Sequence, residues 1–423
     1  YKCNIGAGRQ PKPCGCPRFL PEDIFVLKVI RQYFKVTDKV YILLCLLCSA
    51  FSVLTLVSIG KYQLGGFEYD SISGAVTGIG GYRQALVQAA DSILGIACAL
   101  VISSIDYRDL VKLWPFHTAI TWGLVLPTLI LHNLKLGPLT IGYDAGGTDN
   151  YSWYKLGSLT LQPTELAKIS FILTFAMHLD HARDHVNEPA ELAKIMAHIL
   201  VPVGLIHIQG DDGTAIIFMA IGCVMLFAAG LSWRYIGGAA AAVLSVSAIV
   251  VGFFRDKVFK SYQFARIMAV IYPDDPAYAR YTYQQNKGVI SIGSGQIFGR
   301  GLFGENHNVV PNVWNDFIFS YIAEAVGFVG CLVVLGVLFS IAFKTLATGL
   351  RSEDQCGSYI CIGIFAAMFF QITINLGMNL QVLPVIGVTL PFFSAGGSSV
   401  TMLYLCVGVV LSVYLHNKKN LFE

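Results

Sequence analysis

Charge is scarce in this sequence. Of the 423 residues only 13% are Asp, Glu, Lys or Arg, whereas 55% are hydrophobic and the mean hydropathy is +0.62. Soluble domains carry about 25% charged residues, so this chain lacks the polar side chains needed to coat a water-soluble globule. So apolar a chain is not intrinsically disordered either. The net charge of +3 is too small to favour a nucleic-acid-binding protein.

Other absences narrow the class further. None of the 11 cysteines falls in a segment expected outside the membrane, so no extracellular disulfide framework is expected. No internal repeat is detectable, which counts against a transporter built from inverted repeats. The first 39 residues are basic and rich in Pro and Gly, without the apolar core of a cleavable signal peptide. Because the chain begins with Tyr1 rather than Met, we expect its natural start to lie upstream.

What the sequence does contain is a series of apolar blocks of the length of a membrane crossing. About 20 apolar residues span the roughly 30 Å of hydrocarbon in a bilayer. We therefore predict an all-α, polytopic membrane protein with about ten transmembrane helices and one long extracellular loop at about 255–316. The predicted spans cover residues 40–60, 84–105, 116–134, 163–178, 197–208, 213–230, 235–254, 317–343, 356–378 and 399–416. The span at 197–208 is short, which suggests a broken or tilted helix.

The distribution of Lys and Arg predicts the orientation. Ten spans place both termini on one side, and an excess of Lys and Arg in short loops marks the cytoplasmic side. We therefore expect a multi-pass protein of the cell membrane with a cytoplasmic arm at 1–39, a ten-helix membrane domain at 40–416 and a cytoplasmic tail at 417–423. With the termini inside, the short outside loops hold only Lys61, Arg83, Lys135 and Lys155.

The N-terminal arm carries Cys3, Cys14 and Cys16. A structural zinc site needs four ligands, typically with paired Cys or His residues two to four positions apart, and no fourth ligand lies nearby. We therefore interpret these three residues as reduced thiols, and we predict no metal ligand in the chain.

Polar clusters open four of the helices that run from the outside inward. A helix N-terminus exposes free N–H groups and about half a positive charge, which suits a phosphate. Gathered together, the four ends would form an anion-receptive surface at the outer leaflet. Ordinary N-capping explains any single cluster equally well. The clusters lie at residues 162–168, 209–214, 315–316 and 394–399.

Glu165 and Lys168 in the first cluster are three residues apart, so they share one face of a helix. The apolar run that follows carries them into the membrane boundary. Ionisable groups at that depth are costly and usually face a protein interior or a water-filled cavity. The pair is therefore either a structural ion pair or part of a catalytic or binding site, and the sequence leaves both open.

The segment 255–316 is polar, aromatic and basic. It holds seven Lys or Arg residues, and Arg266, Gln284 and Lys287 are candidates to bind an anionic head group. Long ordered loops beside a membrane are usually functional. Adhesion of the loop to lipid phosphates is the alternative explanation. No strand precedes its glycine-rich stretch at 293–301, so a dinucleotide-binding fingerprint is not supported.

Six motifs, in this order, resemble those of the SEDS family (shape, elongation, division and sporulation), whose members include RodA, FtsW and a sporulation paralogue. The resemblance spans residues 37–416. The run at 375–379, NLGMN, favours the RodA branch. The motifs are LQPTELAK, QGDDGTA, GLSWRYIGG, YQQNKGVISIGSGQIFGRGLFG, NDFIF with Ala323-Glu324 and Gly327, and LPVIGVTLPFFSAGGSS.

The resemblance implies a peptidoglycan glycosyltransferase that polymerises lipid II into glycan strands on the outer face of the cytoplasmic membrane, in cell elongation or division. It also implies a class B penicillin-binding transpeptidase and other elongation or division proteins as partners. In the family, the aspartate of the DFIF motif is the proposed catalytic residue, and it matches Asp316. The family's functionally important glutamate and lysine of a QPSELAK-like motif match Glu165 and Lys168.

These residues suit the chemistry that the resemblance implies. A sugar hydroxyl must attack an anomeric carbon that carries a lipid diphosphate, and a carboxylate can take the proton of that hydroxyl. Asp316 is the candidate base. A divalent cation such as Mg²⁺ or Mn²⁺ could also serve the diphosphate, although no cofactor is required by this scheme. Lys168 and Arg266 are candidates to stabilise the leaving diphosphate, with a backbone cradle at Gly396, Gly397, Ser398 and Ser399.

The chain departs from the usual residues of the family at Gly210, Asn312, Asn315 and Ala395. These departures leave the reaction type intact and affect substrate fit and activity. Two other functions therefore stay open, a flippase for the lipid-linked precursor and an inactive scaffold of the cell-wall machinery. A flippase needs ionisable groups near the middle of several spans, whereas the charges here gather at the outer helix ends, which favours surface chemistry.

Overall fold

The computed structural model describes residues 33, 35–62, 64, 80–144, 150–157, 159–249, 261–396 and 398–417. Within these ranges the chain is mostly helical. Cys3, Cys14 and Cys16 of the N-terminal arm, Gly397 and residues 418–423 lie outside the described residues.

Ten helices coincide with the ten predicted membrane spans. Six of them (α2, α3, α7, α13, α14 and α15) are long and apolar enough to cross a membrane, and α8 is a shorter apolar helix. The prediction of a polytopic helical membrane protein is therefore confirmed. The ten are α2 (Lys39–Lys61), α3 (Gly80–Ser104), α5 (Trp114–Ile130), α6 (Pro163–Ala182), α7 (Pro189–Ile208), α8 (Asp212–Ala228), α9 (Trp233–Ile249), α13 (Ile318–Leu350), α14 (Gln355–Asn379) and α15 (Ser398–His416).

Local sequence explains where several helices begin. Asp38 and Asp211 are the N-caps of α2 and α8, and each carboxylate accepts a hydrogen bond from the backbone N–H three residues later, at 2.9 Å and 3.1 Å. Pro163 and Pro189 occupy the first positions of α6 and α7, where the N–H that proline lacks would have no partner in the helix.

Helix α7 is longer than predicted. The sequence suggested a short span at 197–208, but the helix is continuous over 20 residues from Pro189. The charged residues that precede position 197 do not interrupt it, because Lys194 donates to Glu191 at 2.7 Å along the helix surface. The prediction of a short or broken span at this position was therefore wrong, and a tilt of the helix stays a prediction.

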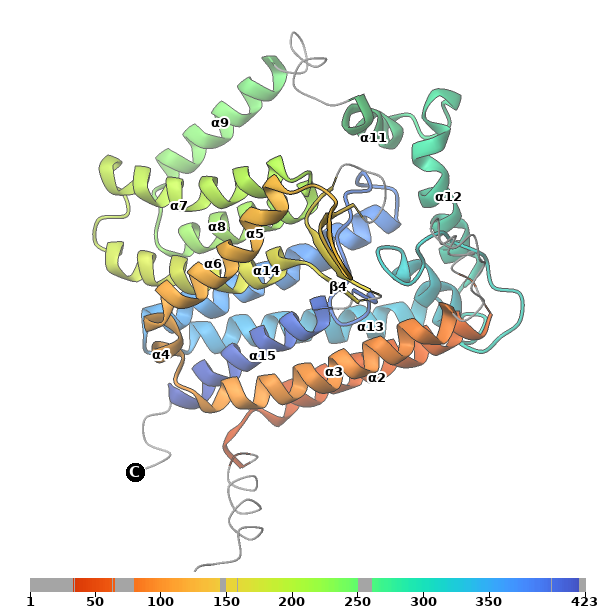
Figure 1. The fold of residues 1–423 in the computed structure, drawn as a ribbon, viewed down its shortest axis with the longest axis horizontal. Helices are drawn as coiled ribbons and strands as arrows, with labels where there is room; N and C mark the ends of the chain where they lie inside the picture. Colours follow the sequence, from red (N-terminus) through yellow and green to blue (C-terminus); the bar gives the residue numbers. More distant parts are fainter. Residues whose placement is uncertain are drawn as a thin grey trace, which may run out of the picture.

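Close helix packing depends on small residues. Helix α15 packs along α3, and the two lie side by side with α2 in Figure 1. A Cβ added at Gly95 of α3 would lie 2.9 Å from the Tyr404 side chain, and one at Gly408 of α15 would lie 2.8 Å from the backbone of Ala99. Such small residues let helix backbones approach closely in membrane bundles. The start of α2, the short helix α4 (Tyr107–Lys112) and the end of α15 share one end of the bundle (Figure 1).

The chain between α5 and α6, predicted to be an outside loop, contains a small sheet that the all-α prediction missed. It is an antiparallel meander in the order β1-β2-β3-β4. Three to five residues per strand are too few to show a clear period-two pattern in the sequence. The helical class therefore holds for the membrane-spanning part, and the sheet is an addition to it. Its strands are β1 (Leu134–Leu136), β2 (Leu139–Tyr143), β3 (Trp153–Leu156) and β4 (Leu159–Leu161).

The predicted long loop is largely helical where it is described. It contains α11 (Ser261–Ile271), the 3-10 helix η2 (Pro276–Tyr278) and α12 (Ala279–Ser294). Gln285 in α12 donates through Nε2 to the carbonyl oxygens of Met378 and Leu383, at 3.0 Å and 2.8 Å. This contact fixes α12 to the turn after α14, close to the start of α13.

Candidate active site

Asp316 lies two residues before the start of α13, on a stretch of backbone that the chain near residue 394 holds in place. The backbone N–H of Ala395 donates to the carbonyl oxygen of Trp314 at 2.8 Å. The Ser394 hydroxyl donates to the carbonyl oxygen of Asn315, also at 2.8 Å. The fourth and third of the predicted polar clusters thus meet in the structure, and together they fix the approach to Asp316.

Two buried asparagines of α14 hold the backbone of Asp316 itself. Asn375 and Asn379 lie one helical turn apart, and each donates through Nδ2 to the Asp316 carbonyl oxygen at 2.9 Å. Asn375 also donates to the Val388 carbonyl oxygen at 2.8 Å. Amide groups buried in a membrane segment are costly unless hydrogen-bonded. The hydrogen bond that both amides share is the one to the Asp316 carbonyl oxygen, which fixes the backbone at this residue.

The carboxylate of Asp316 is left facing a glycine turn. Gly387 has φ +74°, a conformation that disfavours any side chain, and a Cβ added there would lie 3.9 Å from Asp316 Oδ2. With glycine at position 387, no side chain of this residue stands beside the carboxylate. A reacting group needs access to a general base.

The surroundings tune this carboxylate toward neutral pH. Burial, and to a smaller extent the negative charge of Asp211, raise the pKa of Asp316 to about 6, while the positive charge of Arg266 acts in the opposite direction. A carboxylate with this pKa is mostly ionised at pH 7 and is a stronger base than an ordinary Asp, whose pKa lies near 3.9. The pKa of this carboxylate therefore lies in the range that suits a general base near neutral pH.

Arg266 reaches the site from α11. Its guanidinium Nη1 donates to the carbonyl oxygen of Val385 at 3.1 Å. Val385 lies two residues before Gly387, so one short turn connects the residue that Arg266 contacts with the residue that faces Asp316. The structure thus brings together a base and a cation that lie fifty residues apart in the sequence.

Asp211 connects the Asp316 region to the start of α6. It is buried, and its Oδ2 accepts a hydrogen bond of 2.6 Å from Gln162 Nε2. Burial raises the pKa of Asp211, and the negative charge of Glu165 adds to the effect. Gly213 in the first turn of α8 packs against the Ile386 carbonyl oxygen so closely that a Cβ would collide with it. The start of α8 therefore packs closely against the turn at Ile386 and Gly387, which lies beside Asp316.

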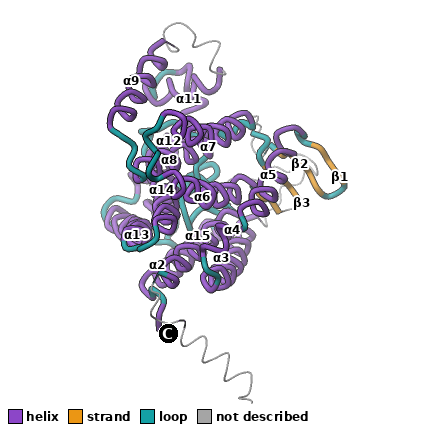
Figure 2. Tube along the Cα trace, turned by 90° about the vertical axis from the view of Figure 1, so that its left-hand side faces the viewer, coloured by secondary structure: helices purple, strands orange, loops and turns teal. Residues whose placement is uncertain are grey.

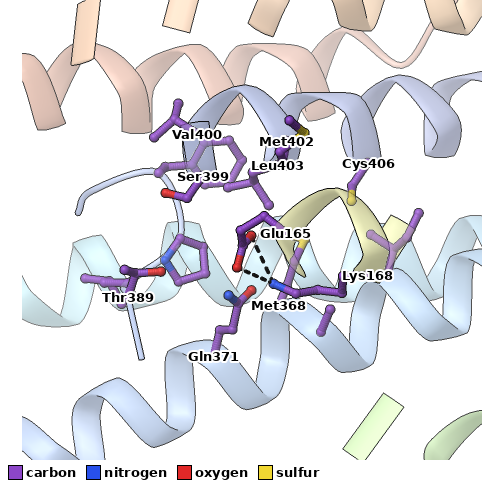
Figure 3. Close-up of a pocket in the computed structure, with 15 residues that line it drawn as sticks. Glu165, Lys168, Met368, Gln371, Thr389, Ser399, Val400, Met402, Leu403 and Cys406 are labelled. Atoms are coloured by element: carbon purple, nitrogen blue, oxygen red, sulfur yellow. Dashed lines mark hydrogen bonds and ion pairs between the residues drawn. The ribbon is translucent and has the colours of Figure 1, made fainter. Parts of the chain in front are cut away.

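Glu165 and Lys168 form a close ion pair in α6. Lys168 Nζ donates to both carboxylate oxygens, at 2.9 Å and 3.1 Å, and the side chains are only 12% and 6% exposed. The pair lines a cavity of about 30 Å³ between α6, α14 and α15, next to Gln371, Thr389 and Ser399 (Figure 3). This volume holds about one or two water molecules and no sugar. In this structure the charges of Glu165 and Lys168 are directed at each other.

The start of α15 joins the same region. The Ser398 hydroxyl accepts a hydrogen bond from the backbone N–H of Gln162 at 3.3 Å, which ties the start of α15 to the start of α6. Ser399 lines the cavity, and Gly396 lies so close to the Ser399 hydroxyl that a Cβ there would clash. Gly397, the remaining residue of the predicted cradle, lies outside the described residues.

The other two predicted binding residues, Gln284 and Lys287, lie on α12, and their described contacts are with residues other than Asp316. Gln284 donates through Nε2 to the Pro311 carbonyl oxygen at 2.8 Å, which supports the loop leading to Asp316. Lys287 Nζ lies 5.9 Å from the centroid of the Tyr283 ring. Neither contact is made with Asp316.

Sequence reasoning missed the residues that position Asp316. Asn375 and Asn379 appeared only in a branch-specific motif, although two amides four residues apart in an apolar span are unusual enough to indicate a role. Asp211 and Gln162 were assigned to helix starts, without their contact to each other. Such contacts join distant segments, so no local pattern reveals them.

A second buried carboxylate, Glu324, shapes the loop that leads toward the site. It is fully buried and accepts hydrogen bonds from the Ser291 hydroxyl at 2.6 Å, from Arg300 Nη1 at 3.2 Å and from Asn308 Nδ2 at 2.8 Å. Three residues later Gly327 (φ +68°) kinks α13. Glu324 therefore folds the chain after α12 onto α13.

The geometry assigns no site for the divalent cation considered above. Within the described ranges, no three His, Cys, Asp or Glu side chains are arranged to hold a metal ion. Asp211 and Asp316 supply two carboxylates without such a third ligand.

Comparisons with known proteins agree with this architecture. The family model of FtsW, RodA and SpoVE, described as "Cell cycle protein", matches residues 38–419. The chain is 28% identical over 395 residues to the probable peptidoglycan glycosyltransferase FtsW of Trichlorobacter lovleyi, covering 92% of this chain and 96% of that protein. It is 35% identical over 291 residues to the peptidoglycan glycosyltransferase MrdB of Escherichia coli (strain K12), covering 66% of this chain and 76% of that protein.

Solved structures show the same fold. A chain of a peptidoglycan synthase complex, studied for how polymerization and crosslinking are coordinated, matches with a TM-score of 0.65 at 26% identity, over 88% of this chain and 98% of that chain. The rod shape determining protein RodA of Thermus thermophilus matches with a TM-score of 0.58 at 26% identity, over 90% and 98%. The relatives divide between FtsW and RodA or MrdB names, so the preference for the RodA branch stays a prediction. The chain belongs to the FtsW/RodA/SpoVE family, the SEDS family of membrane peptidoglycan glycosyltransferases.

Proposed function

We propose that this membrane glycosyltransferase polymerises lipid II on the outer face of the cytoplasmic membrane, with Asp316 as the general base. Asp316 takes the proton of the attacking 4-hydroxyl of N-acetylglucosamine as that oxygen bonds to the anomeric carbon of the donor. The bond from the anomeric carbon to the diphosphate breaks, and the lipid diphosphate leaves with the electron pair. A direct displacement of this kind inverts the anomeric centre.

One observation carries the proposal: the backbone of Asp316 is fixed while its carboxylate stays open and basic. Asn375 and Asn379 hold its carbonyl oxygen, and Gly387 leaves room beside Oδ2. A pKa of about 6 gives the carboxylate both ionisation and basicity at neutral pH. Positioning and a matched pKa are the two properties that a general base requires.

The leaving diphosphate needs positive charge near the base. Arg266 contacts the turn beside Asp316 and is close enough to lower the pKa of its carboxyl, so it is our first candidate. Lys168 is neutralised by Glu165 and can serve the diphosphate only after that pair opens. The N-terminus of α15, which begins at Ser398, is a helix end of the kind that suits a phosphate, although the Ser399 N–H already donates to the Gly396 carbonyl oxygen at 3.2 Å.

We also infer that both termini face the cytoplasm and that a class B penicillin-binding transpeptidase is the partner. The Lys and Arg distribution supports this orientation. The start of α2 and the end of α15 lie at the same end of the helix bundle (Figure 1), as expected if both termini are on one side of the membrane. A structurally similar chain belongs to a peptidoglycan synthase complex that also crosslinks, which supports a crosslinking partner here.

The test is polymerisation of labelled lipid II by the purified protein in detergent, alone and with its cognate class B transpeptidase. We expect glycan ladders from the parent chain and none from Asp316→Asn. The matched control is Asp274→Asn, which changes an exposed carboxylate of the same outer segment and should leave the ladders intact. Wild-type rates from Asp316→Asn would contradict its role as base. An inactive parent chain, even with the partner, would favour a flippase or scaffold, and lipid translocation in vesicles would separate those two.

A further inference from the structure

The four-stranded sheet between α5 and α6 has two chemically different faces. Residues paired across strands, and residues two apart along one strand, share a face. By the observed register, one face, here called the lysine face, carries Lys135, Thr140, Lys155 and Thr160, aligned across the four strands. The other face, here called the leucine face, carries Leu134, Leu136, Leu139, Leu156, Leu159 and Leu161.

Only part of the leucine face is covered by protein. Near its middle, Ile141 is buried, and the Tyr154 hydroxyl donates to the Leu124 carbonyl oxygen of α5 at 2.9 Å. Away from α5 the leucines of β1, β3 and β4 are 36–59% exposed in the described structure. Five exposed leucines on one small sheet form a concentrated apolar patch, which usually marks an interaction surface.

We propose that this face lies in the outer leaflet of the bilayer, with its leucines in contact with lipid acyl chains. The sheet begins four residues after the end of α5, and β4 ends two residues before the start of α6. Two helices that coincide with predicted membrane spans, α5 and α6, therefore hold it at the level of the outer membrane boundary. The strands project from the bundle beside α5 (Figure 2) and cross the direction of the neighbouring helices (Figure 1), as an element lying along the membrane would.

The lipid-facing surface of α5 continues onto the sheet. Ile120 and Ile130 on α5 are 59% and 72% exposed, as expected for side chains that contact acyl chains in a membrane-crossing helix. Leu134, the first residue of β1, follows Ile130 by four residues. A bilayer that covers the end of α5 therefore reaches the leucine face without a break.

The opposite face has the composition of a membrane interface. Lys135 and Lys155 lie on it, and Lys155 Nζ lies 4.5 Å from the centroid of the Tyr143 ring. Basic and tyrosine side chains are favoured at the head-group level, where lipid phosphates supply negative charge. A leucine face toward acyl chains and a lysine face toward phosphates is the arrangement of an interfacial amphipathic element.

This placement has a structural consequence for the site. Strand β4 continues through Gln162 into α6, which carries Glu165 and Lys168, and Gln162 also contacts Asp211 and Ser398. A sheet anchored in the outer leaflet fixes the depth at which these helix starts meet. The assignment does not depend on the chemistry proposed above, because it concerns only where the sheet lies; that the leaflet is the outer one rests on the orientation inferred there.

The test compares neighbouring cysteines on the two faces. The variants are Leu136→Cys against Lys135→Cys in β1, and Leu159→Cys against Thr160→Cys in β4, with each label located by peptide mass spectrometry. The full chain is reconstituted into vesicles of phosphatidylethanolamine and phosphatidylglycerol and treated with a membrane-impermeant maleimide. Without lipid, Leu159 is more exposed than the half-buried Thr160, so slower labelling at position 159 requires something that covers it.

We expect the leucine-face cysteines to react roughly tenfold or more slowly, because a thiol among acyl chains has a raised pKa and little thiolate. A fluorophore attached at the same cysteines in detergent, before reconstitution, should be quenched more strongly by a phospholipid with brominated acyl chains on the leucine face than on the lysine face. Equal rates with the impermeant reagent would place the leucine face in water. Slow labelling without quenching by the brominated lipid would mean that protein covers the leucine face, and either result would overturn the proposal.

Discussion

Acidification from pH 7 to pH 5 should remove most of the polymerase activity. With a pKa of about 6, Asp316 is about nine-tenths ionised at pH 7 and about one-tenth ionised at pH 5. A general base acts only in its ionised form, so kcat/KM should fall about tenfold over this interval. An Asp with an ordinary pKa near 3.9 would stay about nine-tenths ionised at pH 5, and the rate would barely change.

Two variants test the cause of this pH dependence. The negative charge of Asp211 raises the pKa of Asp316, so Asp211→Asn should move the acid limb of the profile to lower pH. The positive charge of Arg266 lowers that pKa, so Arg266→Gln should move the same limb to higher pH. A general loss of stability or of binding would not shift the two variants in opposite directions.

The assay is the dependence of kcat/KM for labelled lipid II on pH, between about pH 5 and pH 8 in detergent. Circular dichroism at each pH would show that the fold persists. An active parent chain with a flat profile from pH 7 to pH 5 would refute Asp316 as a base with a raised pKa. A limb that stays in place in both variants would refute the electrostatic explanation.

Three further perturbations follow from the geometry. Glu165→Gln leaves Lys168 buried without its counter-charge and should lower the free energy of unfolding by about 3–5 kcal/mol. The double variant Glu165→Gln with Lys168→Met should lose less stability in thermal unfolding. An equal or larger loss in the double variant would contradict the pairing. Asn379→Leu removes one of the two hydrogen bonds on the backbone carbonyl of the base, so kcat should fall about tenfold with KM unchanged; in steady-state kinetics, a raised KM with unchanged kcat would contradict a positioning role for Asn379. Gly387→Ala forces a side chain into φ +74° and should cost about 1–2 kcal/mol, whereas Gly336→Ala, which has open space around it, should cost little.

The membrane architecture could be predicted from sequence because the length of an apolar block directly reflects the thickness of the bilayer. All ten predicted spans coincide with helices. The predicted span at 197–208 was too short, because α7 begins at Pro189 and includes Glu191 and Lys194. Hydropathy counts each charge separately, whereas in the helix these two residues are one turn apart and form an ion pair.

The sheet and the completed site could not be predicted for two different reasons. The alternation Leu134-Lys135-Leu136 is visible in the sequence, but three residues are too few to distinguish a strand from a loop. Asp316 was identified by a motif, yet its contact with Asn379 and its proximity to Asp211 depend on how α14 and α8 pack. Motifs report the residue type that a site needs, and packing decides which neighbours tune it.

Four carboxylates near the site differ in the hydrogen bonds that they accept. Glu165 is neutralised by Lys168, Asp211 accepts hydrogen bonds from a side chain and a helix N–H, and Glu324 accepts several. Each of these carboxylates accepts at least two hydrogen bonds. The carboxylate of Asp316 accepts no hydrogen bond from the described residues, because its donors are directed at the backbone carbonyl instead. Its lone pairs therefore remain available for a proton, and this difference is the physical reason to assign the base to Asp316 rather than to those other three.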